Sequence, residues 1–592
     1  MNKINRQSFL KLGALALMAP LGNKVFAGMG PVISDHYLPV NELMKRLVAA
    51  NDKQVEALVQ SITPDKFVYT RRIGSDFSVL SAGYCSPESV YYQDPQLISK
   101  LEILVQGLLK AQNPDGTMNS GNLESPPDTA FLIEVITPGA LILLKKNAAE
   151  LGTVNAEIKK FIVTAGESLV TGGVHTPNHR WVVCAALSKI NEIYPDKKYL
   201  VRINEWLAEG IYNDSEGQYP ERSRNYSDVE NNSLITMGRL LNHPILFEPV
   251  RKSLAGNYYY MEPNGDLVTT DSRRQDQWGA KSMISYYLPY RYMAIHDKNA
   301  RFAGIAKMIE QLEGFDREVL SRGLFQFLSN PLLQEELPAG DIPPVDYQKF
   351  FTTSQLLRIR RGDNTATLFG GVDWPIIIAS GRSNSPDFFS CRKGKAILKY
   401  MRLSSQFFSM GYFYSEGIKK DGNSYVLHKK LEVPYYQPLP ASKRKANGDY
   451  KLSPSIDDRF WNKMDFSNRP VSNVKTLDTT VTFNEVNGSN ELSFHVTGLV
   501  GVLVTIELCF SEGGKLSGIV EGENGNNFLE QGMGKYEMGG DSIQFGPGAM
   551  THHSVDNLEG ERYSTHFGTL KTKGTRVYIT GTTPFTHKLV FS

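Results

Sequence analysis

Apolar residues recur at intervals of three and four positions through the first half of the chain, from Val40 to about Leu312. This spacing is typical of helices that bury one face. The clearest segments are Leu97–Leu109, Leu141–Leu151, Ile158–Leu169, Trp181–Ile193, Leu200–Ile211, Leu234–Leu241, Val250–Tyr260 and Ile284–Met293. We therefore predict a run of α-helices of ordinary length over this half of the chain.

Polar turns that contain glycine divide the predicted helices into pairs. Asp115-Gly116, Glu216-Gly217 and Asn264-Gly265 fall at comparable points of successive pairs, and such dipeptides end helices. Helices that repeat in pairs indicate stacked helical hairpins. The pattern therefore predicts an N-terminal (α/α) toroid, an incomplete barrel of helical hairpins.

Beyond roughly Leu324 the pattern changes to short segments rich in β-branched and aromatic residues, many of them alternating. These segments are Leu356–Arg360, Thr365–Phe369, Ala396–Tyr400, Thr480–Phe483, Leu499–Val504 and Arg576–Thr580. They predict a C-terminal antiparallel β-sandwich. The proline-rich stretch Pro331–Pro344 is the best boundary candidate, and we divide the chain into a signal peptide (1–27), a toroid (28–325) and a sandwich (326–592).

The composition agrees with a soluble protein of several domains. The chain has 592 residues, more than one hydrophobic core normally supports. Its 41% hydrophobic and 21% charged residues are ordinary for a globular protein. A formal net charge of +2 gives no reason to expect nucleic acid or a membrane surface as a partner. An acidic ligand would have to be attracted by a local basic patch.

The N-terminus has the composition of an export signal. Its parts are the basic residues Lys3, Arg6 and Lys11, the apolar run Leu12–Leu21 and the small-residue cleavage site Val25–Ala27. The run is too short to span a bilayer as a mature helix, and we expect no membrane span later in the chain. Asn5 stands where a twin-arginine signal has its first arginine. We therefore expect export to the periplasm or beyond, by a route that this departure leaves open.

The four cysteines do not indicate a metal site or a disulfide framework. Cys85, Cys184, Cys391 and Cys509 are far apart and form no CxxC pair. Cys184 follows Trp-Val-Val and is expected to be a buried small hydrophobe. We expect neither a metal nor an organic cofactor.

The first motif with candidate chemistry is Thr171–Trp181, in which His175, Asn178, His179 and Arg180 follow a Gly-Gly turn. Thr176 is a plausible N-cap with proline at the first helical position, so a helix is expected to begin there. Free backbone N–H groups in its first turn favour an anion. The cluster is suited to holding a carboxylate, and the alternative is a capping and packing turn.

The second motif is Tyr219–Tyr226, Tyr-Pro-Glu-Arg-Ser-Arg-Asn-Tyr. Tyr226 could transfer a proton, and a phenol that acts as a base requires nearby positive charge, which Arg222 and Arg224 would supply. Alternatively, its ring packs in the toroid wall. Tyr219 and Glu221 are expected to orient the loop. A carboxylate clamp with a tyrosine acid/base meets the requirements of β-elimination from a uronic-acid glycan.

Two further loops offer substrate-binding candidates. Arg273 and Arg274 lie beside Asp276, and arginine forks bind carboxylates through two hydrogen bonds. An arginine–aspartate pair that stabilises the helical ring is the alternative. Asn122 and Asp128, together with Asn119, follow the Asp115-Gly116 turn and resemble groups that bind sugar hydroxyls.

Histidines in the β region provide one weaker catalytic candidate. His428 could approach the toroid and is kept as a possible acid/base. His552-His553 is a poor metal signature, because no third ligand stands at a telling spacing.

Asn178-His179 and the Glu221, Ser223, Tyr226 spacing resemble the heparinase II/III-like polysaccharide lyases. The resemblance implies a toroid followed by antiparallel sheets, an Asn that neutralises the uronate, often beside a His, and a Tyr in a Glu-x-Ser-x-x-Tyr setting as acid/base. Many such lyases carry a His-x-His-x-Asp-like segment in the sheet domain, and this chain has none. That departure points away from the heparin and alginate branches and towards a branch similar to the rhamnose–glucuronate lyases.

Two other classes of function remain open on sequence. A glycoside hydrolase on a helical toroid would need a carboxylic acid paired with a carboxylate, for which Asp128, Glu221 and Asp276 are available. A glycan-binding protein without catalysis would use the same loops to hold an acidic sugar. An unsaturated uronate product, which absorbs in the ultraviolet, separates the lyase from both.

Overall fold

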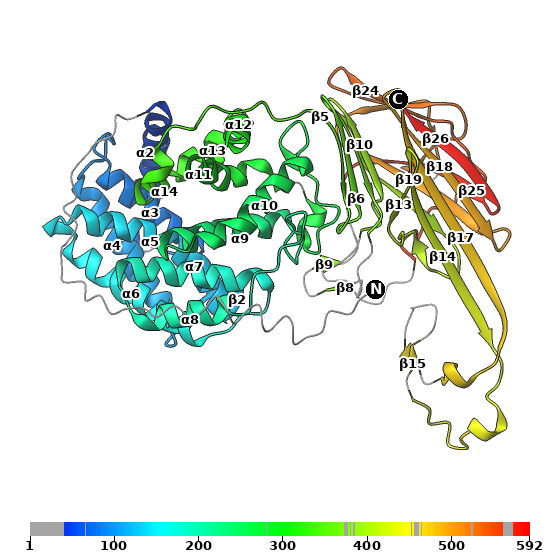
Figure 1. The fold of residues 1–592 in the computed structure, drawn as a ribbon, viewed down its shortest axis with the longest axis horizontal. Coiled ribbons are helices and arrows are strands. Elements are labelled where there is room, and N and C mark those ends of the chain that lie inside the picture. The colour runs from blue at the N-terminus through cyan, green and yellow to red at the C-terminus, as the bar shows by residue number, and fades with distance from the viewer. Residues whose placement is uncertain are drawn as a thin grey trace. The chain divides into compact units, whose positions relative to one another are not determined.

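Helices make up the first half of the protein and strands the second half in a computed structural model (Figure 1). This order confirms the predicted fold class, a helical region followed by antiparallel β-sheets. The structure describes residues 41–64, 67–279, 281–371, 377–378, 381–382, 385–451, 453–454, 461–462, 464–522, 525–560 and 572–592. The predicted signal peptide, 1–27, lies outside these residues.

The helical half contains helices at the segments predicted from periodicity, with several boundaries displaced: α8 ends at Leu207 rather than Ile211, and α9 begins at Arg224, ten residues before the predicted Leu234. Its helices are α2 (Glu42–Ser61), α3 (Arg72–Cys85), α4 (Pro95–Ala111), α5 (Pro126–Lys146), α6 (Gly152–Thr171), α7 (Pro177–Ile193), α8 (Lys197–Leu207), α9 (Arg224–Leu240), α10 (Phe247–Asn257), α11 (Tyr287–Asp297), α12 (Ala300–Ile309), α13 (Phe315–Glu318) and α14 (Leu324–Ser329). The helix expected over Leu141–Leu151 is wrong. α5 begins fifteen residues earlier and ends at Lys146, because Asn147 adopts the left-handed conformation (φ 50°) that closes a helix.

The helices pack in two alternating rows. α3, α5, α7 and α9 lie side by side, and α4, α6 and α8 form a second row. α3 and α7 are buried on almost every side, whereas α8 buries only Tyr199 and Ile203. A helix that is apolar all round belongs inside a protein, and an amphipathic one covers it. The first row is therefore the inner wall of the toroid.

Neighbouring side chains satisfy the backbone of α5, although Pro138 interrupts its hydrogen bonds. A proline has no N–H to donate to the carbonyl four residues earlier, which here belongs to Glu134. Lys189 Nζ donates to that carbonyl instead, at 2.8 Å. Ser78 Oγ donates to the next carbonyl, that of Val135, at 2.6 Å. The proline thus joins α5 to α7 and α3.

α5 is the one helix among the described residues that is long and apolar enough to cross a membrane. About 78% of its most apolar window is buried inside the protein. Its composition is that of an inner helix of the ring, between α3 and α7.

The β region consists of two large sheets. The ten-stranded sheet has the order β21-β22-β25-β19-β11-β10-β7-β6-β5, with β12 on β11. The eight-stranded sheet has the order β13-β14-β17-β18-β26-β24-β23-β20. Pairing is antiparallel except between β22 and β25, which run parallel. The antiparallel architecture was predicted, and the parallel pair was not.

The strands of the two sheets match most of the predicted segments. The first sheet contains β5 (Asp346–Phe351), β6 (Leu356–Arg361), β7 (Asn364–Phe369), β10 (Phe389–Lys393), β11 (Ala396–Ser405), β12 (Gly411–Tyr412), β19 (Leu503–Phe510), β21 (Val520–Glu521), β22 (Asn527–Phe528) and β25 (Thr575–Thr582). The second contains β13 (Ile418–Asp421), β14 (Ser424–Tyr436), β17 (Val471–Val486), β18 (Ser489–Gly498), β20 (Lys515–Ser517), β23 (Gly534–Met538), β24 (Asp541–Gly546) and β26 (Phe585–Phe591). The strand predicted over Leu499–Val504 begins only at Leu503, because Gly501 has φ 83° and turns the chain.

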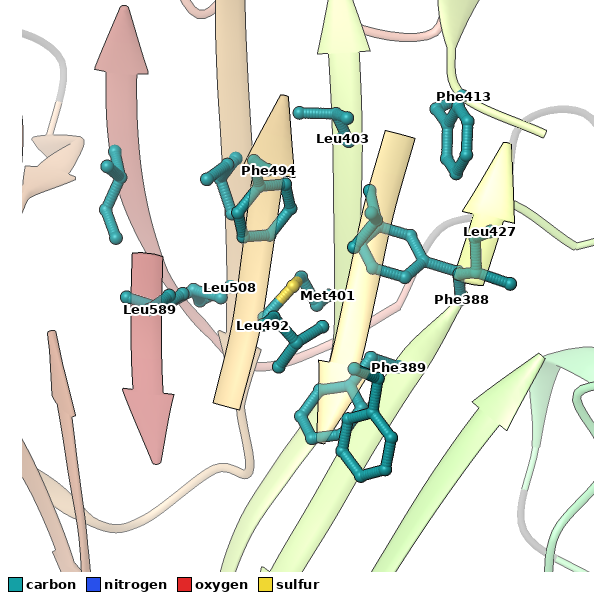
Figure 2. Packing of buried hydrophobic residues seen from close by; sticks show 14 of the residues in the cluster. Phe388, Phe389, Met401, Leu403, Phe413, Leu427, Leu492, Phe494, Leu508 and Leu589 are labelled. Carbon is teal, nitrogen blue, oxygen red and sulfur yellow. The ribbon is translucent and has the colours of Figure 1, made fainter. Parts of the chain in front are cut away.

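The core of the sandwich lies between the two sheets. Met401 and Leu508 come from the first sheet, and Leu427, Leu492 and Leu589 come from the second. Figure 2 shows these side chains and the phenylalanines around them pointing into the same layer. Alternation along each strand puts these residues on one face.

The helical and β regions are joined through a buried ion pair. Arg358 of β6 is fully buried and lies 2.8 Å from Glu262, which precedes β3 (Asp266–Leu267). Its guanidinium also donates to the backbone carbonyls of Tyr259 (3.1 Å) and Met261 (3.4 Å). Thr365 adds a hydrogen bond to the same carboxylate, at 2.5 Å.

Replacing Arg358 by alanine is expected to lower the free energy of unfolding by about 3–5 kcal/mol, because Glu262 loses its 2.8 Å cationic partner and two buried carbonyls lose a donor. Lys430→Ala is the matched control. It breaks the pair with Glu432, in which both side chains are about half exposed, and is expected to leave stability nearly unchanged because solvent screens such a pair. Denaturant titration of both variants provides the measurement. Equal losses in the two would contradict the buried pair's role.

Candidate active site

The loop before α9 is held by short side chains that bond to its own backbone. Asp214 Oδ1 accepts hydrogen bonds from the N–H groups of Glu216 (2.9 Å) and Gln218 (2.8 Å). Ser223 caps α9 by accepting from the N–H of Tyr226 at 3.1 Å. The Ser223 hydroxyl also donates to Asp276 at 3.0 Å, which ties the loop to residues 271–278. Tyr226 therefore occupies a fixed first turn.

α7 begins at Pro177, as the N-terminal proline predicts. Thr176 is the N-cap residue with an extended backbone (φ −138°, ψ 154°), but its side chain makes no capping bond. Its hydroxyl instead accepts a 3.3 Å hydrogen bond from the amide of Asn178. Asn178 lies in the first turn of α7 and is fully buried.

Glu221 connects the two predicted motifs. Its carboxylate accepts hydrogen bonds from the amide of Asn178 at 2.9 and 3.1 Å and forms an ion pair with Arg274 at 2.5 Å. All three side chains are buried. Burial raises the pKa of Glu221, and the Arg274 charge and the Asn178 amide oppose that rise. Glu221 was predicted to orient its loop. In the structure its side chain contacts two other candidate site residues, Asn178 and Arg274.

Tyr226 lies against Arg274, whose guanidinium carbon is 4.1 Å from the centre of the phenol ring. The phenol oxygen accepts a 2.8 Å hydrogen bond from Gln275. Tyr226 is partly exposed rather than packed away in the core. Arg274 therefore places positive charge against the ring of Tyr226.

His179 lies in a mixed aromatic and cationic environment. Its ring meets His175 edge-on with centroids 4.7 Å apart and Phe131 at 6.1 Å. Burial lowers the pKa of His179 to about 3, with further contributions from His175, Arg274 and Arg71. The imidazole is therefore neutral at ordinary pH. Its Nδ1 is buried and has no hydrogen-bond partner in the described part of the chain.

Three of the predicted arginines point elsewhere. Arg180 pairs with Glu209 at 2.8 Å and stacks on Trp181, away from the cluster. Arg224 is buried in the ring, where it lies 3.9 Å from both Asp271 and the centre of the Tyr260 ring. Arg222 donates to the backbone of Thr353 in the β region at 3.1 Å.

The cation at Tyr226 is thus Arg274 and not the two arginines proposed from sequence. Arg273 supports the same loop from its backbone side: it donates to the carbonyl of Pro220 at 2.6 Å, and its N–H donates to the carbonyl of Glu221 at 3.0 Å.

The two candidates after the Asp115-Gly116 turn bind one another. Asp128 Oδ2 accepts from the backbone N–H of Asn122 at 3.2 Å and from its side-chain amide at 3.1 Å. The other oxygen of Asp128 forms an ion pair with Arg71. Arg71 in turn stacks over Phe131 at 5.3 Å, on the side chain that contacts His179. These residues form the edge of the cluster next to His179.

The histidines of the β region are not brought to this cluster by any contact among the described residues. His428 lies on β14 with about half of its side chain exposed and contacts Asp478 at 3.1 Å. His552 contacts the carbonyl of Val504 at 3.1 Å, and His553 packs on Phe528. In the described part of the chain, no three His, Cys, Asp or Glu side chains are grouped as metal ligands.

Arg71 and Gln275 were missed by sequence reasoning. Gln275 follows the predicted Arg273-Arg274 pair directly, so a wider window would have included it. Arg71 stands in Tyr-Thr-Arg-Arg, about a hundred residues before the first motif, and no sequence spacing connects it with either motif. Its place depends on α3 packing beside α5.

A separate small cavity lies in the toroid away from these residues. It is lined by the later turns of α5, α7 and α9, among them Thr137, Lys189 and Arg239. The candidate site uses the first turns of the same helices. The cavity and the site are therefore at different ends of the inner wall.

Polysaccharide lyases of known structure have a similar fold. Heparinase III matches 95% of this chain and 86% of its own, with a TM-score of 0.56 and 12% identity. Chondroitin AC lyase of Streptomyces coelicolor A3, in complex with chondroitin sulphate, matches 94% of this chain and 80% of its own, with a TM-score of 0.55 and 10% identity. A Paenibacillus xanthan lyase matches 94% of this chain and 57% of its own, with a TM-score of 0.52 and 9% identity.

No protein-family model matches the chain, and no curated protein matches its sequence. The chain has the fold of the polysaccharide lyases that join an (α/α) toroid to a β-sheet domain.

Proposed function

We propose that this protein is a polysaccharide lyase that cleaves a uronic-acid-containing glycan by β-elimination. The observation that carries the proposal is the position of the Tyr226 phenol against Arg274, in a cluster that also contains a neutral His179. The likeness in fold to chondroitin, heparin and xanthan lyases supports it. The proposed partner is an acidic oligo- or polysaccharide.

The chemistry requires a base, a proton donor and neutralisation of the sugar carboxylate. The base removes the proton at C5, the electron pair of that bond forms the C4–C5 double bond, and the C4–O bond breaks. The leaving oxygen then takes up a proton. Tyr226 is assigned the proton transfers, and Arg274 stabilises its phenolate form. Hydrogen bonds and positive charge at the carboxylate stabilise the charge that develops next to it.

Asn178 takes part in this scheme through Glu221. A side-chain amide has two N–H groups. In this structure the amide nitrogen of Asn178 donates to the two oxygens of Glu221 and to Thr176. Its donors therefore face inward, and we assign Asn178 the role of holding Glu221 and Arg274 in place.

A glycoside hydrolase is less well supported by the same residues. Its acid and base would be drawn from Asp128, Glu221 and Asp276. Asp128 is paired with Arg71, Glu221 with Arg274, and Asp276 accepts from Ser223. A glycosidase needs one carboxylic acid with a raised pKa that faces the glycosidic oxygen. Each of these carboxyls is instead engaged in supporting another side chain.

The direct test is a screen of uronic-acid glycans for a product that absorbs in the ultraviolet. A lyase produces an unsaturated uronate and therefore absorbance. A hydrolase releases reducing ends without absorbance, and a binding protein releases nothing. Rhamnose-capped glucuronate belongs in the panel, because the rhamnose–glucuronate branch stays a prediction from sequence. Export stays a prediction as well, and cell fractionation tests it.

Replacing Tyr226 by phenylalanine is expected to lower turnover by about 10²–10⁴-fold, because the transferable proton is lost while the ring stays in place. Initial rates of product absorbance measure the effect. Tyr212→Phe is the matched control, since Tyr212 is 61% exposed and lies outside the cluster. A Tyr226→Phe enzyme with near-normal rates would remove the main support for β-elimination.

His179 is expected to make stability depend on pH. Its folded pKa of about 3 lies below the value of about 6.5 for an unfolded histidine. The contribution of the neutral imidazole to the free energy of unfolding is therefore complete above about pH 6.5. It is lost progressively as the pH falls towards 3, because over this range only the unfolded chain takes up the proton.

In His179→Gln, the free energy of unfolding should fall less steeply with decreasing pH over this window than in the wild type. The difference in slope should correspond to the uptake of up to about one proton on unfolding. His428→Gln, at an exposed position, is the control. Denaturant titrations at a series of pH values measure the slopes. Slopes identical to wild type in the His179 variant would contradict the buried neutral imidazole.

A further inference from the structure

The buried carboxylate of Asp128 holds Arg71 at the edge of the cluster. Arg71 immediately precedes α3, and its Nε donates to Ser120 Oγ at 3.0 Å while Nη2 donates to the Ser120 carbonyl at 3.3 Å. The guanidinium also forms an ion pair with Asp128, whose side chain is only 6% exposed. Asp128 is fixed in turn by two hydrogen bonds from Asn122. A buried aspartate at the start of α5 thus sets the position of a long, otherwise flexible side chain.

The hairpin of β1 (Met118–Ser120) and β2 (Asn122–Ser125) closes over this pair because residue 121 is glycine. Gly121 has φ 78°, a conformation that glycine adopts without strain. A Cβ at this position would lie 3.0 Å from Arg71 Nη2 and 3.2 Å from Asp128 Oδ1. The backbone therefore approaches the ion pair more closely than a side chain would allow.

Arg71 is connected to His179 through the ring of Phe131. Its guanidinium lies over Phe131, whose ring is nearly perpendicular to that of His179, with centroids 6.1 Å apart. The charge of Arg71 is among the causes that lower the pKa of His179. Burial lowers the pKa of Arg71, and the Tyr226 phenol is among the groups that oppose this lowering. Arg71 is thus within electrostatic range of both His179 and Tyr226.

Asn178 and Arg274, the other candidates for holding a carboxylate, are engaged by Glu221. The Asn178 amide donates to Glu221 and Thr176, and Arg274 is paired with Glu221 with its side chain only 9% exposed. The side chain of Arg71 is 45% exposed. Its contacts with Ser120 and Asp128 use Nε and Nη2, and Nη1 makes no hydrogen bond among the described residues. An anionic sugar would meet Arg71 with a donor still available.

We propose that Arg71 binds the carboxylate of the uronic acid and makes the site selective for acidic sugars. This inference rests on the proposed function and names the residue that recognises its substrate class. A guanidinium has five N–H donors and stays charged, so Nη1 can donate to a carboxylate while Nε and Nη2 hold Ser120 and Asp128. Asp128 and Ser120 hold the group from one side and leave Nη1 for the ligand.

The test measures binding separately from catalysis. The probes are pairs of oligosaccharides, each pair consisting of a uronic-acid form and its carboxyl-reduced, neutral counterpart. Both are titrated by calorimetry into Tyr226→Phe protein, which keeps the site but does not turn over. The same titrations are made with Arg71→Gln, Arg71→Lys and Arg72→Gln in that background. Arg72 is the matched control, because it is the next residue, is 63% exposed and contacts Asp76 at 3.5 Å.

We expect Arg71→Gln to weaken binding of the acidic form by about 10–100-fold, as for loss of a charged hydrogen bond, and to leave the neutral form within about threefold. Arg71→Lys should recover part of the preference, and Arg72→Gln should keep all of it. Equal weakening of both forms, or an unchanged preference, would overturn the proposal and leave Arg71 as a support for the hairpin. If Arg71→Gln does not fold, Arg71→Lys provides the test. A lysine variant that prefers the acidic over the neutral form as strongly as the parent protein would overturn the proposal.

Failure of the proposed function gives a different result. A glycan that binds with a carboxylate preference dependent on Arg71, but yields no ultraviolet-absorbing product with the wild-type protein, would rule out β-elimination of that glycan and support the role of Arg71. A wild-type protein that forms the product while Arg71→Gln keeps the preference would support the lyase and overturn this inference.

Discussion

The charge of the buried Glu221 carboxylate must be balanced by a nearby cation and hydrogen-bond donors, and the rest of the site is arranged around that requirement. A carboxylate at 6% exposure is unfavourable unless cations or N–H donors surround it. Arg274 and Asn178 supply them from positions 53 residues later and 43 residues earlier. Because Arg274 is fixed at this end, the face of its guanidinium lies against Tyr226. The first turns of α7 and α9 therefore share one electrostatic centre.

The β region supports the same loop from outside the toroid. Glu216 accepts hydrogen bonds from the backbone N–H groups of Thr352 and Thr353, at 2.8 and 3.0 Å, in the turn between β5 and β6. Arg222 donates back to Thr353. These contacts hold the loop on both sides of Glu221. The sheet domain thus contributes rigidity to the candidate site, even though His428 lies elsewhere on β14.

The sequence predicted those features that depend on local spacing. Pro177 at the start of α7 and Tyr226 three residues after Ser223 could be read directly from the chain. α5 was misplaced because it is apolar on nearly every side, so its periodicity is weak until the last turns. The strand at Leu499 was misread because apolar residues continue through a glycine turn.

Partner choice could not be predicted in the same way. Arg180, Arg224 and Arg274 look alike in sequence, yet Arg180 meets an exposed glutamate, Arg224 enters the ring and Arg274 meets Glu221. The selection depends on which buried acid each helix end approaches, a property of packing between segments far apart in the chain. The same reason hid Arg71, whose position follows from Asp128.

The bond between the sheet domain and the loop has a consequence for tolerance to substitution. Glu216 is bound by two main-chain N–H groups, and the Thr352 hydroxyl adds a weaker 3.2 Å contact. Every residue except proline carries such an N–H group. Residues 352 and 353 can therefore be substituted without loss of these hydrogen bonds. On the helical side the same bonds depend on the carboxylate of Glu216. The interface is permissive on the sheet side and restrictive on the helical side, so neutral change would accumulate unequally across it.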